Sequence, residues 1–376
     1  MIKSKICIVV ALLAAVITFS SCDKQHKKKQ ITSEDVEVVK DSILFSFSFV
    51  GCNRVQYGDW HNDNATNAST ANLSVLKRIF DDVTSLEQKP SLFFFLGDLV
   101  LAESDTINLD AQLKAWVELY EDKAFSTISD SGIELVAVPG NHEMLFYNTS
   151  DDKEYPLAGS TPVWIKYMKP YMPADRNHIT GKDSLVNQMT FSFARNNVGF
   201  VVMNTDTYNQ PNPLTKENPY GFEGLIPTQW IVNQIKQYKQ NPDIDHIFVL
   251  GHKPYYVDGK PETGHKGFPE GPVLWPELQK NEVVAMLSAH VHDYQRMQPG
   301  GTGTYQIIAG NGGSKGPAAF FGYSTINIMS NGEVQFISRG FDKGSPYYQD
   351  VPSNPIKVQD STMLTWSKNT NPYQNN

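Results

Sequence analysis

Residues 92–98 read Leu-Phe-Phe-Phe-Leu-Gly-Asp, an apolar run of strand length that stops at a small residue and is followed at once by a metal-binding type of side chain. The pattern recurs at residues 135–142, 247–252 and 283–292, where the runs lead to Asn-His, His and His-Val-His. Such runs are typical of the buried strands of a layered α/β fold, in which ligands gather just beyond the carboxyl ends of the strands. We therefore predict that four strand ends bring these side chains to one edge of the fold.

Amphipathic segments separate these runs. Residues 73–86, 109–125 and 229–238 carry apolar side chains at helical spacing, and each segment leads into one of the apolar runs. Alternation of strand and helix is typical of right-handed parallel crossovers. Further short strands are predicted at residues 44–50, 191–193, 199–204, 305–309, 325–329 and 334–338. We expect two stacked sheets with helices on the outside.

The N-terminus predicts an export signal. Lys3 and Lys5 precede an apolar stretch at residues 6–19, and Ser-Ser-Cys22 follows. The stretch has about 14 residues, short of the roughly 20 that span a bilayer. Small residues directly before a cysteine resemble a bacterial lipoprotein signal, with Cys22 as the lipidated first residue; an ordinary secretory signal with an incidental cysteine is the alternative. We predict a signal peptide at 1–21, a polar tether at 22–42, and a lipid-anchored protein of the bacterial cell envelope that faces the periplasm or the exterior.

The composition limits partners and redox chemistry. Loss of Lys3 and Lys5 with the signal would change the formal net charge from −8 to −10, which argues against nucleic acid as the main partner. Of the three cysteines, Cys7 leaves with the signal and Cys22 is predicted to be acylated, so Cys52 alone remains in the folded part. No intrachain disulfide is then expected.

The side chains at the strand ends predict a metal site. Asp98 offers two anionic oxygens that can bridge two cations, Asn141 offers an amide oxygen, and His252, His290 and His292 offer imidazole nitrogens. Mixed oxygen and nitrogen sets suit Zn, Mn or Fe better than Ca. In an extended segment, residues two apart face the same way, so His290 and His292 are expected to converge. Taken alone, each motif has a common structural explanation, such as a turn or a helix cap; in combination they predict one shared site.

The motifs together resemble the signature of the calcineurin-like metallophosphoesterases. The resemblance rests on Gly-Asp at 97–98, Gly-Asn-His-Glu at 140–143, Gly-His at 251–252 and Ala-His-Val-His at 289–292. Residues 289–296 and the Gly-Asn-Gly-Gly at 310–313 are similar to the purple acid phosphatase branch. The resemblance covers roughly residues 43–339. It implies a four-layer α/β/β/α sandwich of two mixed sheets flanked by helices. The length of the chain predicts one domain at 43–350, and the polar, Pro/Asn-rich residues 351–376 predict a loosely docked tail.

The same resemblance implies roles for the site residues. Asp98 would bridge two metal ions, and one of these ions would also be bound by Asn141, His252 and His290. His292 would bind the other ion. The family further implies that His142 touches the phosphate and assists the leaving group.

The first strand departs from the family pattern, which ends there in Asp-x-His or Asp-x-Gly. Here Cys52 takes the Asp position and Arg54 the His position. Cys52 is either a thiolate ligand for Zn or Fe or a small buried filler, and Asn53 can instead ligate through its amide oxygen. Asp-Trp-His at 59–61 is a further candidate, because it matches the family's Asp-x-His pattern, but it lies several residues beyond the strand. The second ion is therefore predicted to be held weakly or by an unusual Cys/Asn set.

Two further consequences follow from these departures. Arg54 is expected either to pair with a phosphate oxygen or to form a structural ion pair. The purple branch also needs a tyrosine shortly after Asp98, and residues 99–102 offer none, so a tyrosinate-ligated iron is not expected.

The sequence thus predicts a metal-dependent hydrolase of phosphomonoesters or small phosphodiesters. Two ions of Mn, Zn or Fe would activate the attacking water, as is usual for displacement at phosphorus. The zinc-peptidase motif His-Glu-x-x-His does not occur in the chain. The alternative is a non-catalytic envelope lipoprotein that retains the fold and a partial metal site, because the first motif is altered.

Overall fold

The computed structural model describes residues 42–56, 58–59, 67–125, 127–148, 150, 153–180, 188–206 and 226–366. Contacts divide the chain into two units, Met1–Lys40 and Asp41–Asn376, and the described residues all belong to the second. The predicted signal, Cys22 and nearly all of the tether lie outside the described residues. Within the described ranges, no helix is both long and apolar enough to cross a membrane.

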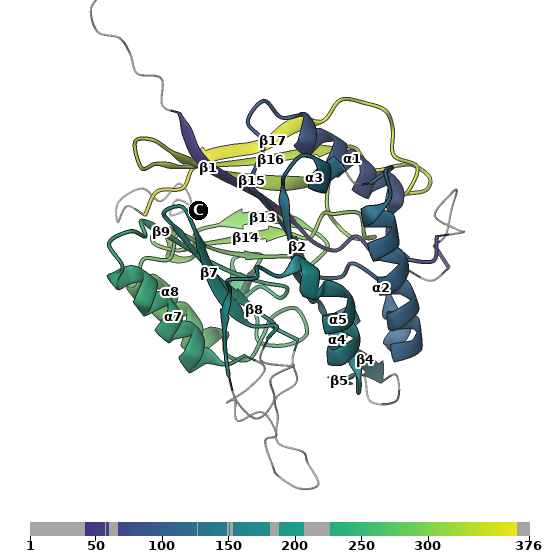
Figure 1. Cartoon of the computed structure of the whole chain (residues 1–376), viewed down its shortest axis with the longest axis horizontal. Coiled ribbons are helices and arrows are strands. Elements are labelled where there is room, and N and C mark those ends of the chain that lie inside the picture. The colour runs from purple at the N-terminus through teal and green to yellow at the C-terminus, as the bar shows by residue number, and fades with distance from the viewer. Residues whose placement is uncertain are drawn as a thin grey trace, which may run out of the picture. The chain divides into compact units, whose positions relative to one another are not determined.

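The first of two large sheets has six strands in the order β17-β16-β15-β1-β2-β3 (Figure 1). β1, β2 and β3 run parallel, whereas β15, β16 and β17 add antiparallel pairs next to β1. The strands are Ile43–Val50 (β1), Leu92–Leu96 (β2), Glu134–Val138 (β3), Phe321–Met329 (β15), Val334–Phe341 (β16) and Lys357–Met363 (β17). The carboxyl ends of the three parallel strands therefore share one edge.

The second sheet has seven strands in the order β13-β14-β12-β9-β8-β7-β6. β8, β9, β12 and β14 run parallel, and β13, β7 and β6 are antiparallel to their neighbours. The strands are Asn177–His178 (β6), Phe191–Arg195 (β7), Val198–Met203 (β8), His246–Gly251 (β9), Ala285–Ser288 (β12), Tyr294–Met297 (β13) and Tyr305–Ala309 (β14). The carboxyl ends of the parallel strands again share an edge.

Helices cover the outer faces of both sheets. Asn72 caps the first helix through its side-chain oxygen, and Asp105 caps the second, which begins earlier than predicted for this reason. The helices are Leu73–Ser85 (α1), Thr106–Glu121 (α2), Thr127–Asp130 (α3), Asn141–Met144 (α4), Ser160–Met168 (α5), Thr228–Gln240 (α7) and Gly271–Lys280 (α8).

Smaller elements complete the described part of the chain. Two hairpins are formed by Leu145–Asn148 (β4) with Lys153–Pro156 (β5) and by Tyr256–Val257 (β10) with Lys260–Pro261 (β11). Short 3-10 helices are formed by Ala102–Ser104, Lys169–Tyr171 and Pro299–Gly301.

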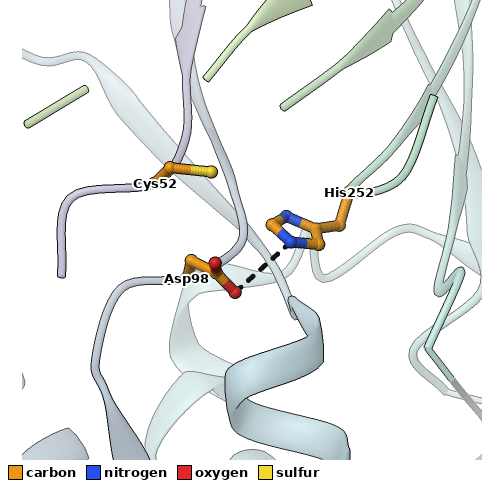
Figure 2. Close-up of side chains that lie close together, drawn as sticks. All are labelled: Cys52, Asp98 and His252. Carbon is orange, nitrogen blue, oxygen red and sulfur yellow. Dashed lines mark ion pairs between the residues drawn. The ribbon is translucent and has the colours of Figure 1, made fainter. Parts of the chain in front are cut away.

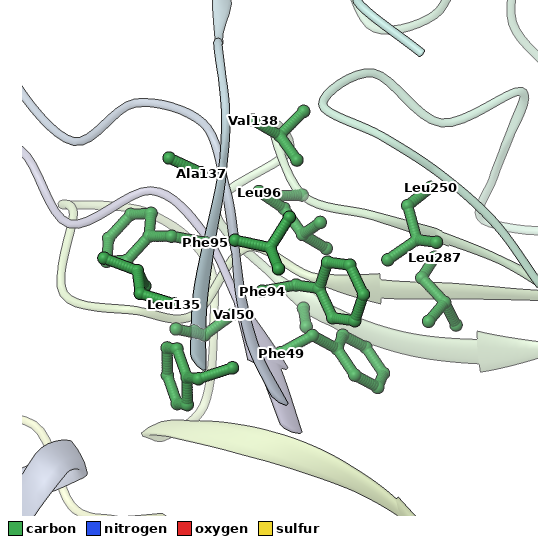
Figure 3. Close-up of a cluster of buried hydrophobic side chains, with 14 of the residues drawn as sticks. Phe49, Val50, Phe94, Phe95, Leu96, Leu135, Ala137, Val138, Leu250 and Leu287 are labelled. Carbon is green, nitrogen blue, oxygen red and sulfur yellow. The ribbon is translucent and has the colours of Figure 1, made fainter. Parts of the chain in front are cut away.

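The main core lies between the two sheets and is rich in aromatic side chains. Phe47 of β1 lies 5.0 Å from Phe200 of β8 and 5.0 Å from Phe248 of β9, measured between ring centroids. Figure 3 shows the part of this core where Phe94 of β2 and Leu250 of β9 meet. Edge-on contacts of this kind add specific attraction to the burial of apolar surface.

Alternation along the strands fills the outer layers. Phe93 of β2 points away from the second sheet and lies 5.6 Å from Phe80 of α1, measured between ring centroids. In β9, Ile247 and Val249 belong to a separate apolar cluster with the buried side chains of α7 and α8. A strand places successive side chains on opposite faces, so each sheet is buried on both sides. The chain therefore forms the predicted four-layer α/β/β/α sandwich.

The end of the fold differs from the sequence prediction. Residues 357–363, expected in a loosely docked tail, form β17 and pair with β16. Asp360 of this strand accepts hydrogen bonds from the Tyr294 hydroxyl at 2.6 Å and from Arg296 Nε at 2.7 Å. The strand lacks an apolar pattern because it lies at the sheet edge and most of its side chains are exposed. The folded domain therefore extends past Asp350.

Candidate metal centre

Backbone hydrogen bonds tie the strand ends together. After β1, the Cys52 N–H donates to the Gly97 carbonyl at 2.9 Å and the Asn53 N–H donates to the Asp98 carbonyl at 3.0 Å. On the second sheet, the Ala289 N–H donates to the His252 carbonyl at 2.9 Å. These bonds hold the turns at fixed positions, so the side chains that they carry converge on one place.

Four side chains of this cluster sit on left-handed backbone. The φ angles are 61° at Cys52, 57° at Asp98, 62° at His290 and 43° at His292. Non-glycine residues seldom adopt this conformation, and such strain concentrates at functional sites. His290 and His292 therefore lie in a turn after β12 and not in the extended segment that the sequence predicted. Their side chains still reach the same cluster, because His290 Nδ1 lies 3.1 Å from Asn141 Oδ1 and His292 Nε2 lies 3.9 Å from Asp98 Oδ2.

Glycines permit the close approach of the turns. A Cβ at Gly140 would lie 2.4 Å from Asp98 Oδ1, and one at Gly97 would lie 2.5 Å from His252 Nδ1. Gly97 also has a φ of +84°. Gly97 and Gly140, the residues before Asp98 and Asn141, are therefore required by the close packing of the neighbouring ligands.

Asp98 stands at the centre of the cluster and is buried. Its Oδ1 lies 3.3 Å from His252 Nε2, the pair that Figure 2 marks. Its Oδ2 lies 3.7 Å from Arg54 Nε and 3.9 Å from His292 Nε2. Burial alone would raise the pKa of the Asp98 carboxyl, but the neighbouring His252, His142, His292 and Arg54 hold it well below its usual range. The carboxylate is therefore ionised and faces a different set of partners with each oxygen.

Two histidines each hold one ring nitrogen against a backbone carbonyl and turn the other toward Asn141. His252 Nδ1 lies 2.7 Å from the Leu96 carbonyl, and His290 Nε2 lies 2.8 Å from the His265 carbonyl. A carbonyl can only accept, so each ring carries a proton on this atom, and in a neutral ring the other nitrogen has the free electron pair. Burial, and next the His252 ring, hold the pKa of His290 well below its usual range, which keeps His290 neutral. The lone pairs of His252 Nε2 and His290 Nδ1 face one another at 3.2 Å.

Asn141 adds an amide oxygen to the same point. Its Nδ2 donates to Glu154 Oε1 at 3.0 Å, which turns Oδ1 toward the histidines. Asn141 Oδ1 lies 3.1 Å from both His252 Nε2 and His290 Nδ1. Asp98 Oδ1 joins this group through His252, whose Nε2 lies 3.3 Å away. Such a set fits a cation, and outer partners of this kind are typical of metal ligands.

Cys52 is buried and lies beside this set (Figure 2). Its sulfur and one ligand atom each of Asp98 and His252 all lie within 4.8 Å of one another. The sulfur also accepts the His290 N–H at 3.1 Å. Burial and then the charge of Asp98 raise the pKa of the Cys52 thiol well above its usual value, which favours the neutral form. Both sequence interpretations of Cys52, ligand and buried filler, are compatible with this position.

Other candidates from the first motif have structural partners. Asn53 Nδ2 donates to the Gly312 carbonyl at 2.7 Å and the Asn72 carbonyl at 3.2 Å, while its buried oxygen has no hydrogen-bond partner among the described residues. Asp59 pairs with Lys315, with 3.2 Å between Oδ1 and Nζ. His61, the other half of that alternative, lies outside the described residues.

His142 follows Asn141 in α4 and lies next to the carboxylate. Its Nδ1 lies 2.9 Å from the Leu101 carbonyl, and its N–H donates to Asp98 Oδ1 at 3.3 Å. Burial, and then the positive charge of Arg54, lower the pKa of His142 to about 4. At neutral pH the ring is neutral, with its proton on Nδ1 and a free electron pair on Nε2.

Glu143 supports the metal ligands, although no role was predicted for it from the sequence. It is fully buried and accepts the N–H groups of Gly140 at 2.8 Å and of Asp98 and Val100 at 3.1 Å each. Burial and then the charge of Asp98 raise the pKa of Glu143 to about 7. The sequence feature that indicates a role for Glu143 is its position in the Gly-Asn-His-Glu motif at 140–143. Glu143 joins the turns after β2 and β3 and so positions Asp98 and Asn141.

Glu154 is a second supporting residue, and no local pattern predicts it. Besides Asn141, it contacts Lys253 Nζ at 3.0 Å and His265 Nδ1 at 3.3 Å. Burial would raise its pKa, but His265 and Lys253 lower the pKa of Glu154 to about 2. Glu154 lies on the β4–β5 hairpin and reaches the site only through the tertiary fold.

Comparisons with known proteins identify the family to which the chain belongs. A family model described as calcineurin-like phosphoesterase matches residues 54–294, beginning just after Cys52 and Asn53. The structure of PhoD has a TM-score of 0.50 at 13% identity, over 86% of this chain and 70% of that chain. GAP50, the anchor in the inner membrane complex of Plasmodium, has a TM-score of 0.49 at 14% identity, over 87% and 90%. At such identities the likeness concerns the fold alone. A search of curated proteins found no match.

Proposed function

Because this chain belongs to the calcineurin-like phosphoesterase family, we propose that it is a metal-dependent hydrolase of phosphomonoesters or small phosphodiesters. One observation carries the proposal: Asn141 Oδ1, His252 Nε2 and His290 Nδ1 lie within 3.2 Å of one another, each oriented by a hydrogen bond on its far side, and Asp98 Oδ1 lies 3.3 Å from His252 Nε2. A Zn, Mn or Fe ion suits this mixed oxygen and nitrogen set. When bound there, the ion would polarise the ester and lower the pKa of water.

The chain's own residues can hold the phosphate. The Arg54 guanidinium is permanently charged and offers paired donors that match two oxygens of a phosphate. Its side chain is 13% exposed and lies 3.7 Å from Asp98 Oδ2, so an ester beside the carboxylate would meet it. Arg54 thus combines the two roles considered from sequence, an ion pair with Asp98 and a phosphate contact.

His142 is placed to exchange a proton with the ester. The Leu101 carbonyl holds Nδ1, and this leaves Nε2 for the leaving oxygen. A positioned imidazole of this kind typically contributes about 10²–10⁴-fold to the rate. Because Nε2 has a free electron pair at neutral pH, it would first take the proton that the attacking water releases and then pass it to the leaving oxygen.

Hydrolysis assays test the proposal directly. The full chain should hydrolyse p-nitrophenyl phosphate or its bis-ester, lose activity with a chelator and regain it with Mn or Zn. His142→Ala should lower kcat by about 10²-fold or more. Arg195→Ala, which removes a surface ion pair with Asp175 and Glu134, is the matched control and should keep full activity. No turnover with any metal and either ester would contradict the proposal.

One observation favours a second candidate, a non-catalytic protein with a partial metal site. The turn after β1 carries Cys52 and Arg54, where the family resemblance implies ligands for a second ion. This candidate would bind a metal ion without hydrolysing either ester. The same assay, run beside a metal-binding titration, separates the two.

We also propose that the protein is anchored to the bacterial envelope through a lipid on Cys22, with its domain in the periplasm or outside. The support is the charged, apolar and small-residue order of residues 1–22. Cys22→Ala should move the protein from the membrane fraction to the soluble fraction. An unchanged distribution would remove the anchor from the proposal.

A further inference from the structure

The two oxygens of Asp98 face environments of opposite kind. On the Oδ1 side lie electron-pair donors from Asn141, His252 and His290, a set that needs a cation. On the Oδ2 side lies a cation that the chain already supplies, the Arg54 guanidinium, 3.7 Å away. His292 Nε2, at 3.9 Å, is the neighbouring donor on that side.

From this contrast we propose that Arg54 takes the place of a second metal ion, so that the centre binds one ion per chain. The inference rests on the proposed metal centre and deepens it. The metal position on the Oδ1 side fits the residues present. The position on the Oδ2 side does not, because a fixed positive charge lies where a second ion would bind.

Arg54 is held in this place by its backbone. Its N–H donates to the Asp98 carbonyl at 3.3 Å, and its own carbonyl accepts the Ser314 hydroxyl at 2.9 Å. It also pairs with Ala71 in an isolated β-bridge. These contacts on three sides anchor the residue beside Asp98, and its largely buried side chain has little room to move away.

The buried polar atoms point the same way. Arg54 Nε and Asp98 Oδ2 are both buried, and neither has a hydrogen-bond partner within the described part of the chain. An unpartnered donor and an unpartnered acceptor therefore face each other at ion-pair distance. Their charges compensate one another, which a buried carboxylate requires.

A second ion would meet strong repulsion there. Bound to Asp98 Oδ2 at about 2.1 Å, it would lie within about 6 Å of the guanidinium, since Arg54 Nε is 3.7 Å from the same oxygen. Asp98 is the carboxylate shared by both positions, and the first motif offers no other, because Cys52 stands at its Asp position. Two divalent ions and a guanidinium around this carboxylate would leave a large uncompensated buried charge.

Metal counting on the folded, full chain tests this inference. Loaded with Zn or Mn and freed of excess ion, the protein should retain about one ion per chain. Cys52→Asp with Arg54→His, which restores the family's ligand types, should raise the count to about two. Arg195→His, an arginine replaced far from the site, should leave it at one. Two retained ions in the parent protein would overturn the inference.

Electron paramagnetic resonance of the Mn-loaded parent provides a test that needs no variant. An isolated Mn ion should give a simple six-line spectrum, whereas a coupled pair would contradict the inference. Failure of the wider proposal is distinguishable: a protein that retains no ion and hydrolyses no ester lacks the metal centre altogether. A protein that hydrolyses esters with two ions refutes only the role of Arg54.

Discussion

The turns after β1 and β2 have the same left-handed backbone conformation but carry chemically different side chains. Both hold a residue on left-handed backbone just past the strand, with φ of 61° at Cys52 and 57° at Asp98. The two turns are joined by the hydrogen bond from the Cys52 N–H to the Gly97 carbonyl. One turn presents a carboxylate and the other a thiol followed by an arginine. The fold therefore fixes where the side chains stand, and the residue type alone decides whether a turn attracts a metal ion or repels it.

The largest effect should come from the β2 turn. Asp98→Asn removes the carboxylate that faces both His252 and Arg54, and it should lower ester hydrolysis by about 10³-fold, since metal-based charge stabilisation contributes several kcal/mol. Steady-state kinetics at saturating Zn or Mn measure this loss. A near-normal kcat for Asp98→Asn would contradict the comparison, because the β2 turn would then contribute no more to hydrolysis than the β1 turn.

A smaller loss is expected from the support of Asn141. Glu154→Gln weakens the acceptor of the Asn141 amide, and it should reduce metal affinity by about 10–100-fold, as other outer partners do. Competition with a chelating dye measures the affinity. Glu134→Gln, a surface change that removes a salt bridge with Arg195, is the matched control and should leave affinity unchanged. Equal affinities for all three proteins would show that this contact does not orient the ligand.

The β1 turn should be far less sensitive. Cys52→Ser keeps a small buried side chain that can still accept the His290 N–H. Its effect on metal affinity should stay below about tenfold, less than that of removing an outer partner. The same dye competition applies. A loss of metal affinity larger than that of Glu154→Gln would identify the sulfur as a full metal ligand and erase the difference between the turns.

The smallest effect on the site should come from the edge strand β17, which is separated from β1 in the sheet by β16 and β15. Burial would raise the pKa of Asp360, but Arg296 and Tyr294 lower it below its usual value. A carboxyl with a lowered folded pKa stabilises the fold above its unfolded pKa of about 3.9 and loses this contribution as pH falls through the folded value. Asp360→Asn should therefore lower Tm by a few degrees at pH 7. The gap to the parent should close toward pH 3, with metal affinity unchanged throughout; a gap independent of pH would show that the carboxylate charge is not involved.

Much of the fold is visible in the sequence because its strands are buried on both faces. The runs at 92–96, 135–138 and 247–250 lie inside β2, β3 and β9, and the helical spacing at 73–86 matches α1. The polar strand β17 was missed for the opposite reason, because an edge strand exposes most of its side chains. For the same reason, the domain boundary predicted at Asp350 lies before the observed end of the folded domain.

The site was predictable where a ligand directly follows a buried strand. Asp98, Asn141, His252 and His290 stand at such positions and come together in the structure. Glu154 was not predictable, because its contact with Asn141 depends on the placement of the β4–β5 hairpin in space. The prediction that His290 and His292 lie in an extended segment was wrong, because nothing in the local sequence indicates two left-handed residues.

A crystal structure of the Zn-loaded protein, with anomalous scattering recorded at the zinc edge, tests the central claim most directly. The account predicts one strong peak about 2.0–2.2 Å from Asp98 Oδ1, Asn141 Oδ1, His252 Nε2 and His290 Nδ1. An anomalous map with no peak among these four atoms, from protein shown to carry zinc, would contradict it.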